Sequence, residues 1–155
     1  MKIKSISALL GAALFSLASV MSAADGPRVI KIRAGVGNAM KFDVASITAA
    51  AGESIKVTLT NECALPKNVM GHNWVLLTAG TDATAFAAAA AAEAGNNYIP
   101  EKQKDKILAV IGLLGPNETG EVVFKAPTAP GEYTFICTFP AHTAVGMKGV
   151  LVVKK

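Results

Sequence analysis

The chain has 155 residues, of which 52% are hydrophobic and 17% are charged, and its formal net charge is +4. This length favours a single domain with room for one hydrophobic core. The positive side chains come closest together at Lys102, Lys104 and Lys106, but Glu101 and Asp105 alternate with them, which predicts a solvated face. The composition therefore excludes a protein built around a basic nucleic-acid-binding surface.

The beginning of the chain has the layout of a secretory signal peptide. Lys2 and Lys4 precede an apolar run over residues 6–21, and small residues of the kind found at cleavage sites follow it. The run is short for a transmembrane helix. We therefore expect residues 1–24 to be a signal peptide and residues 25–155 to be the mature domain. Loss of the two lysines would lower the formal charge from +4 to +2.

Much of the remaining chain alternates apolar and polar residues, which is typical of half-buried β-strands. In the clearest case, SIKVTLT at 54–60, Ile55, Val57 and Leu59 share one face. Segments that contain glycine and proline separate the strands and predict turns. The expected strands are residues 29–32, 42–47, 54–60, 73–77, 106–113, 121–124, 132–137 and 149–155. Several short strands at this spacing predict an all-β sandwich or barrel.

One segment departs from the strand pattern. Residues 81–96, TDATAFAAAAAAEAGN, are rich in alanine, which is the strongest helix former. Thr81 or Asp82 can cap the start of a helix, and Gly95 can end it. We expect a short alanine-rich helical insertion in the β fold.

The segment CTFPAHTAVGMKG holds Cys137, His142 and Met147, in a chain with only two cysteines and two histidines. The second histidine, His72, stands beside the start of another expected strand. Two histidines and a cysteine with a weak methionine suit copper, because thiolate and thioether favour Cu(I) while imidazole accepts both oxidation states. The combined pattern predicts a metal site.

Each of these residues also has an ordinary structural explanation. Met147 alone could fill the core, and His72 could be a polar residue with satisfied hydrogen bonds. Cys137 could form a disulfide with Cys63, since exported proteins often pair their cysteines. Zinc is the main rival metal, because one cysteine and two histidines can hold it. Zinc gains little from methionine, so the pattern favours copper.

The motif CTFPAH at 137–142, followed by Met-Lys-Gly, and the motif LPKNVMGHNW at 65–74 resemble the azurins. Azurins are small periplasmic blue copper proteins of the cupredoxin superfamily. Weaker similarity runs through NYIP at 97–100, GPNETGEVVF at 115–124 and PGEYTFICTFPAH at 130–142, so that nearly all of the mature chain is covered. The resemblance implies a Greek-key β-sandwich with a helical flap, which agrees with the alanine-rich insertion.

The resemblance also implies one bound copper ion and its ligands. His72, Cys137 and His142 would be the strong ligands, and Met147 would be the weak axial ligand. The backbone carbonyl of Gly71 would lie on the opposite axial side.

Further residues would support this site and present it to partners. By resemblance, Asn73 and Thr143 would brace the ligand loops, and the amides of Asn73 and Phe139 would donate hydrogen bonds to the Cys137 sulfur. Such bonds tune a metal's redox potential. His142 would show its ring edge to solvent through an apolar docking patch. The patch residues are Met40, Leu65, Val69, Met70, Phe139, Pro140, Ala141, Ala144 and Val145.

The sequence departs from the azurin pattern at two points. Azurins have three residues between the second histidine and the methionine, whereas this chain has four, at 143–146, as in auracyanins and plastocyanins. This difference affects the expected distance from copper to Met147. Azurins also carry a disulfide between the first and third strands, but Gly52 and a hydrophobic residue near Val29 stand at those places. Cys63 is then expected to be a free thiol, although an unpaired cysteine in an exported protein can also pair between molecules.

The resemblance implies a periplasmic electron carrier and not an enzyme. Electrons would pass through the exposed edge of His142 to redox proteins that dock transiently, such as c-type cytochromes or periplasmic reductases. We expect a monomer with no nucleic-acid partner and no membrane association after cleavage. The alternatives are a copper chaperone or buffer, and a structural cupredoxin with a Cys63–Cys137 disulfide. A multicopper oxidase or nitrite reductase domain would need further histidines.

Overall fold

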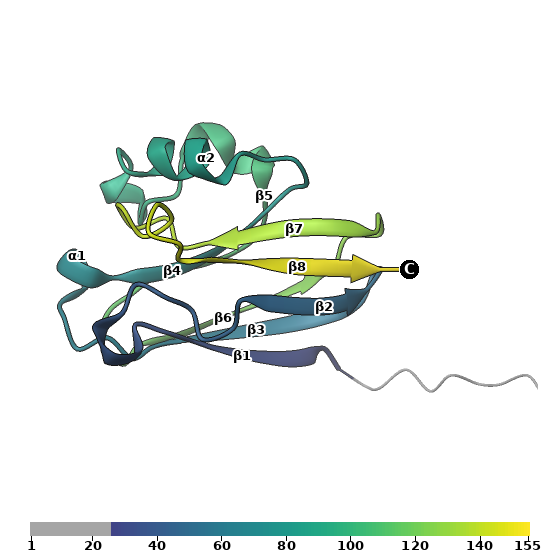
Figure 1. The fold of residues 1–155 in the computed structure, drawn as a ribbon, viewed down its shortest axis with the longest axis horizontal. Coiled ribbons are helices and arrows are strands. Elements are labelled where there is room, and N and C mark those ends of the chain that lie inside the picture. The colour runs from purple at the N-terminus through teal and green to yellow at the C-terminus, as the bar shows by residue number, and fades with distance from the viewer. Residues whose placement is uncertain (1–25) are drawn as a thin grey trace, which may run out of the picture.

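The structure is a computed structural model and describes residues 26–155, so the expected signal peptide lies outside the described residues. Two sheets pack face to face with short helices around them (Figure 1), and the predicted mostly-β sandwich is confirmed. The strands are β1 (Arg28–Ala34), β2 (Ser46–Ala50), β3 (Ser54–Asn61), β4 (His72–Leu77), β5 (Ile107–Leu114), β6 (Thr119–Lys125), β7 (Gly131–Ile136) and β8 (Lys148–Lys154). The helices are α1 (Lys67–Met70) and α2 (Ala83–Ala90), and the 3-10 turns are η1 (Val36–Asn38), η2 (Ala94–Asn96) and η3 (Glu101–Lys106).

The first sheet has the order β1-β3-β6 and the second has the order β2-β8-β7-β4-β5. β1 runs parallel to β3, and β2 runs parallel to β8, while the other neighbours are antiparallel. α1 and the loop between β7 and β8 lie at the left end of the sandwich in Figure 1, away from the C-terminus. Within residues 26–155, no helix has the length and apolar character needed to cross a membrane.

The central strand β4 is buried on both faces. Trp74 and Leu76 belong to the main core between the sheets, whereas Val75 and Leu77 pack with Phe86 of α2 in a second cluster. This double burial explains why HNWVLL has no alternation of polar residues. The helix thus covers the face of β4 on which Val75 and Leu77 lie.

Most of the expected elements form, with ends that differ by a few residues. The strand expected at 42–47 is largely wrong, because Phe42 forms only an isolated bridge with Ala34 and β2 begins at Ser46. α2 begins as predicted, with the Asp82 side chain accepting hydrogen bonds from the amides of Thr84 and Ala85. It ends at Ala90, well before Gly95, because the chain turns there to carry the following residues back towards β4. The four-residue helix α1 was not predicted.

The single tryptophan provides a test of the core. Trp74 is fully buried, and its indole nitrogen has no hydrogen-bond partner among the described residues. We therefore expect a strongly blue-shifted fluorescence emission, since the indole lies in an apolar core and its nitrogen has no hydrogen-bond partner among the described residues. The emission should move to longer wavelength on unfolding in guanidinium chloride. An emission already at the unfolded position in the native protein would contradict this core.

The ion pair between Arg28 and Glu53 provides a test of stability. The Arg28 guanidinium bonds the Glu53 carboxylate and holds its pKa below the usual value, and the amide of Ala50 also donates to that carboxylate. The pair is partly exposed. Glu53→Gln should therefore lower the free energy of unfolding by about 0.2–1 kcal/mol at neutral pH. Because the pKa of Glu53 is lower in the folded protein than in the unfolded chain, the ionised carboxylate stabilises the fold at pH values above the unfolded-state pKa. This stabilisation is lost as the pH falls through the folded-state pKa. Urea unfolding measured across this pH range should show the free energies of unfolding of the wild type and of Glu53→Gln converging at acidic pH.

Candidate metal centre

The strand pairing of the second sheet brings His72 and the Cys137 loop together. His72 is the first residue of β4, and Cys137 follows the last residue of β7. These strands are antiparallel neighbours, with Val75 opposite Ile136. The Cys137 sulfur lies 3.3 Å from Nδ1 of His142, and the ring centroids of His72 and His142 are 4.9 Å apart. Three of the predicted ligands therefore gather at one end of the sandwich.

The fourth residue, Met147, closes the loop on this cluster. Its amide donates to the carbonyl of His142 (2.9 Å), and its carbonyl accepts from the amide of Cys137 (3.1 Å). Its side chain is completely buried in the main core. Ala141 and Gly146 take left-handed backbone conformations, with φ of 69° and 96°, which let the chain reverse within this short loop. Burial of Met147 agrees equally with a core residue and with a weak ligand.

A network around Asn73 braces the start of the loop. The Asn73 side chain accepts from the Thr138 amide (2.7 Å) and donates to the Thr138 hydroxyl (2.6 Å) and the Asn97 carbonyl (3.2 Å). The Thr138 hydroxyl donates in turn to the Tyr98 carbonyl (2.7 Å). The Thr143 hydroxyl donates to the Cys137 carbonyl (2.7 Å), which ties the middle of the loop to its start. The sequence reading did not single out Thr138.

Burial controls the protonation of Cys137. The thiol is fully buried, which raises its pKa to about 12, although the backbone amides of Asn73 and Phe139 donate to the sulfur and oppose that rise. The protonated thiol is therefore the stable form at neutral pH without a metal ion. The same two amides are the ones that the resemblance assigned to the sulfur.

Burial also keeps the two imidazoles neutral. It lowers the pKa of His72 to about 4, and burial together with the nearby His72 lowers the pKa of His142 to about 4. Both rings thus keep an unprotonated nitrogen at neutral pH. Nδ1 of His72 lies 3.1 Å from Oδ1 of Asn61, while Nε2 of His72 is buried without a partner among the described residues.

The donor set fits a soft metal ion. Within residues 26–155, no group of three or more His, Cys, Asp or Glu side chains is placed so that it could hold a metal ion. The buried nitrogen of His72 without a partner nevertheless needs one, since such a group is costly. A thiol, two neutral imidazoles and a thioether, with no carboxylate among them, match copper better than a hard cation.

The predicted docking patch is only partly exposed. Val69 and Val145 are each 56% exposed, whereas Phe139 is 8% exposed and His142 is 2% exposed. Only a small part of His142 therefore reaches the surface, and the ring edge expected to be exposed is correspondingly small. Met40, Leu65, Met70 and Pro140 are half-buried, and Ala141 and Ala144 are exposed.

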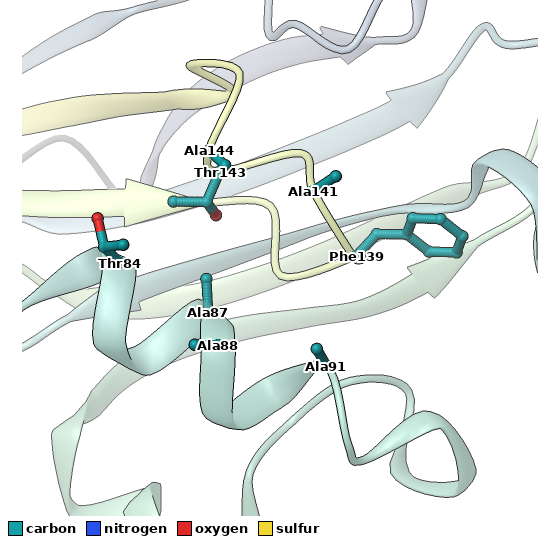
Figure 2. A pocket seen from close by; sticks show the side chains of 8 residues that line it. All are labelled: Thr84, Ala87, Ala88, Ala91, Phe139, Ala141, Thr143 and Ala144. Carbon is teal, nitrogen blue, oxygen red and sulfur yellow. The ribbon is translucent and has the colours of Figure 1, made fainter.

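An apolar groove of about 170 Å³ lies beside the loop (Figure 2). One wall belongs to α2 and its C-terminal end, and the other belongs to the loop that carries His142. The lining residues are Thr84, Ala87, Ala88, Ala91, Phe139, Ala141, Thr143 and Ala144. The alanines of α2 are small enough to leave this space next to the loop.

Cys63 and Cys137 are both free thiols in the structure, so the alternative with a disulfide between them is not supported. Cys63 is buried, its thiol donates to the Asn38 side chain (3.3 Å), and its sulfur accepts from the Leu65 amide (3.4 Å). Its burial also disfavours the pairing between molecules that the sequence left open.

Comparisons with known proteins agree with this reading. Residues 29–154 match the family described as "Copper binding proteins, plastocyanin/azurin family". The chain is 36% identical to Auracyanin-B of Chloroflexus aurantiacus over 129 residues, an alignment that covers 81% of this chain but only 52% of that protein. It is 36% identical to the azurin of Pseudomonas aeruginosa over 118 residues, with 74% of this chain and 78% of that protein covered.

A solved structure is similar throughout its length. The structure of Auracyanin A from Chloroflexus aurantiacus, described as a "blue" copper protein, superposes with a TM-score of 0.72 and 37% identity, and the match covers 83% of this chain and all of the other. The predicted resemblance is confirmed, together with copper as the cofactor of the family and the expectation of a protein that is not an enzyme. The chain belongs to the plastocyanin/azurin family of copper-binding proteins.

Proposed function

We propose that this protein is an electron carrier whose copper ion is held by His72, Cys137 and His142. Met147 would be a weaker ligand of the same ion, and the backbone carbonyl of Gly71 would be a further weak donor. The convergence of a buried thiol with two neutral imidazoles supports this proposal most strongly. Copper bound there would supply one-electron chemistry between Cu(I) and Cu(II).

The chain's own contribution is to hold these side chains in one arrangement for both oxidation states. Asn73 and Thr143 fix the backbone around Cys137 through the hydrogen bonds described above. The amides of Asn73 and Phe139 donate to the sulfur and so help to set the redox potential. A site braced in this way needs little rearrangement when an electron arrives or leaves.

Electrons would reach the site through the His142 ring. This ring has 2% of its surface exposed and lies against Phe139, at a centroid distance of 4.8 Å. The surrounding patch, with Val69 and Val145 as its most exposed large residues, would seat a redox partner so that its cofactor approaches the ring edge. Redox encounters of this kind use small, weak interfaces.

We propose that the carrier works in the periplasm as a monomer, after removal of residues 1–24 leaves the domain at 25–155. Members of the family typically act outside the cytoplasm. Its partners would be proteins such as c-type cytochromes or periplasmic reductases. The small charge of +2 expected after cleavage favours apolar docking over electrostatic steering.

The main competing function is that of a copper chaperone or buffer. A chaperone must hand its metal to another protein, which requires accessible ligands. His72, Cys137 and Met147 are completely buried, and His142 is nearly so. This burial favours a carrier that retains its copper while electrons pass.

The role of Cys137 as a copper ligand can be tested by the visible absorption of the protein with copper added. Copper added to the wild-type chain should give an intense blue band, because a thiolate transfers charge to Cu(II), and a narrow parallel hyperfine splitting in the EPR spectrum. Cys137→Ser should abolish the band, since a hydroxyl cannot replace the thiolate. Cys63→Ser is the matched control and should remain blue. A blue Cys137→Ser protein would rule out this ligand.

The entry route can be tested separately. His142→Gly should slow electron self-exchange strongly, because the ring that links the site to the surface is gone. Added imidazole should occupy the opened position and restore a blue spectrum. Self-exchange can be measured by NMR line broadening in mixtures of the two oxidation states. An unchanged self-exchange rate in His142→Gly would show that electrons enter elsewhere.

A further inference from the structure

The segment that follows η2 lies against the Cys137 loop and has an unusual backbone. Asn97 and Tyr98 are consecutive, and both lie in the left-handed region, with φ of 54° and 60°. Asparagine tolerates this region, but a bulky residue such as tyrosine rarely adopts it. Such a conformation persists only where the surrounding structure holds it, and it is frequent at functional sites. The contacts that Tyr98 makes with the loop give a reason for it.

Hydrogen bonds within the segment fix this conformation. The amide of Tyr98 donates to the carbonyl of Glu93 (2.9 Å). The amide of Ile99 donates to the carbonyl of Asn96 (3.0 Å), and the Asn96 side chain donates back to the carbonyl of Ile99 (2.7 Å). The segment is therefore held by its own turn, and Tyr98 presents a fixed surface to the loop.

Tyr98 contacts the loop through both its backbone and its ring. Its carbonyl accepts a hydrogen bond from the Thr138 hydroxyl (2.7 Å). Its ring packs edge to face with the ring of Phe139, with the centroids 5.0 Å apart and the planes at 66°. Thr138 and Phe139 are the two residues that follow Cys137, so a single residue outside the loop contacts both of them.

Phe139 connects this contact to the candidate centre. The centroid of its ring lies 4.8 Å from that of His142, and its amide donates to the Cys137 sulfur. Phe139 is 8% exposed, whereas Tyr98 is half-buried. Ring contacts therefore run from Tyr98 through Phe139 to His142. Aromatic pairs in such arrangements stabilise each other beyond the area that they bury.

We propose that Tyr98 is a positioning residue that keeps Phe139 packed against His142 and keeps the Phe139 amide directed at the Cys137 sulfur. The proposal rests on the proposed copper site, because only there does this sulfur bind a metal ion. A donor to the sulfur withdraws electron density from it, which disfavours Cu(II) relative to Cu(I) and raises the reduction potential. Tyr98 would thus raise the potential without touching the ion.

The test uses two matched glycine variants of the full chain. Tyr98→Gly removes the ring but keeps the carbonyl that accepts from Thr138, and glycine adopts the left-handed conformation freely. Asn97→Gly makes the same backbone change at the neighbouring exposed residue and keeps its carbonyl, which accepts from Asn73 (3.2 Å). A third variant, Tyr98→Phe, keeps the ring and removes only the hydroxyl.

Voltammetry of the copper-loaded proteins measures the reduction potential. Tyr98→Gly should have a lower potential than the wild type, because Phe139 and its amide lose their support. Tyr98→Phe and Asn97→Gly should keep the wild-type potential. An unshifted potential in Tyr98→Gly, or an equal fall in Asn97→Gly, would overturn the role of Tyr98.

Amide hydrogen exchange in the metal-free protein tests the same role without copper. The Phe139 amide should exchange about 2- to 10-fold faster in Tyr98→Gly, since loss of one aromatic contact favours local opening by that factor. Tyr98→Phe and Asn97→Gly should exchange at the wild-type rate, and an unchanged rate in Tyr98→Gly would contradict the proposal. A wild-type protein that forms no blue copper complex would overturn the proposed function instead, while the exchange rates would still decide whether Tyr98 holds Phe139.

Discussion

Complete burial of the Cys137 thiol is the constraint on which the candidate centre depends. Burial raises the pKa of this thiol to about 12, so a metal ion must displace the proton before the sulfur becomes a thiolate ligand. The amides of Asn73 and Phe139 lower that cost because they donate to the sulfur. Their positions follow from the antiparallel pairing of β4 with β7, which sets the start of the loop against the start of β4. The pairing of the strands therefore determines both the burial of the Cys137 sulfur and the hydrogen bonds that it accepts.

The other donors are held by two separate networks. On one side, Asn73 and Thr138 tie the loop to the segment at Asn97 and Tyr98, where both residues have positive φ. On the other side, Asn61 links His72 to Cys63 and to β5. The histidine from β4 and the cysteine after β7 are thus anchored to different parts of the fold. If these side chains bind copper as proposed, support from several directions would resist the rearrangement that a change of oxidation state otherwise causes.

The surface next to the candidate centre leaves little of His142 exposed but presents small apolar side chains around it. His142 is only 2% exposed, yet the loop to which it belongs has exposed alanine and valine side chains at Ala141, Ala144 and Val145. α2 contributes a wall of alanines beside this loop (Figure 2), and their small size leaves the groove open. The alanine-rich segment at residues 81–96 therefore has a structural role. It is a compact cover for β4 that packs Phe86 inwards and presents almost no side-chain bulk near the loop.

The sequence by itself determined the β-sandwich, the capped start of α2 and the set of residues with the chemistry of a copper site, because these follow from local periodicity, capping and scarce residue types. Only the tertiary structure decided how the donors meet, that Phe139 and His142 are covered, and that Asn61 faces His72. Those features depend on contacts between strands and loops far apart in the chain, and the early end of α2 has the same origin. No local pattern encodes the distance between two such segments.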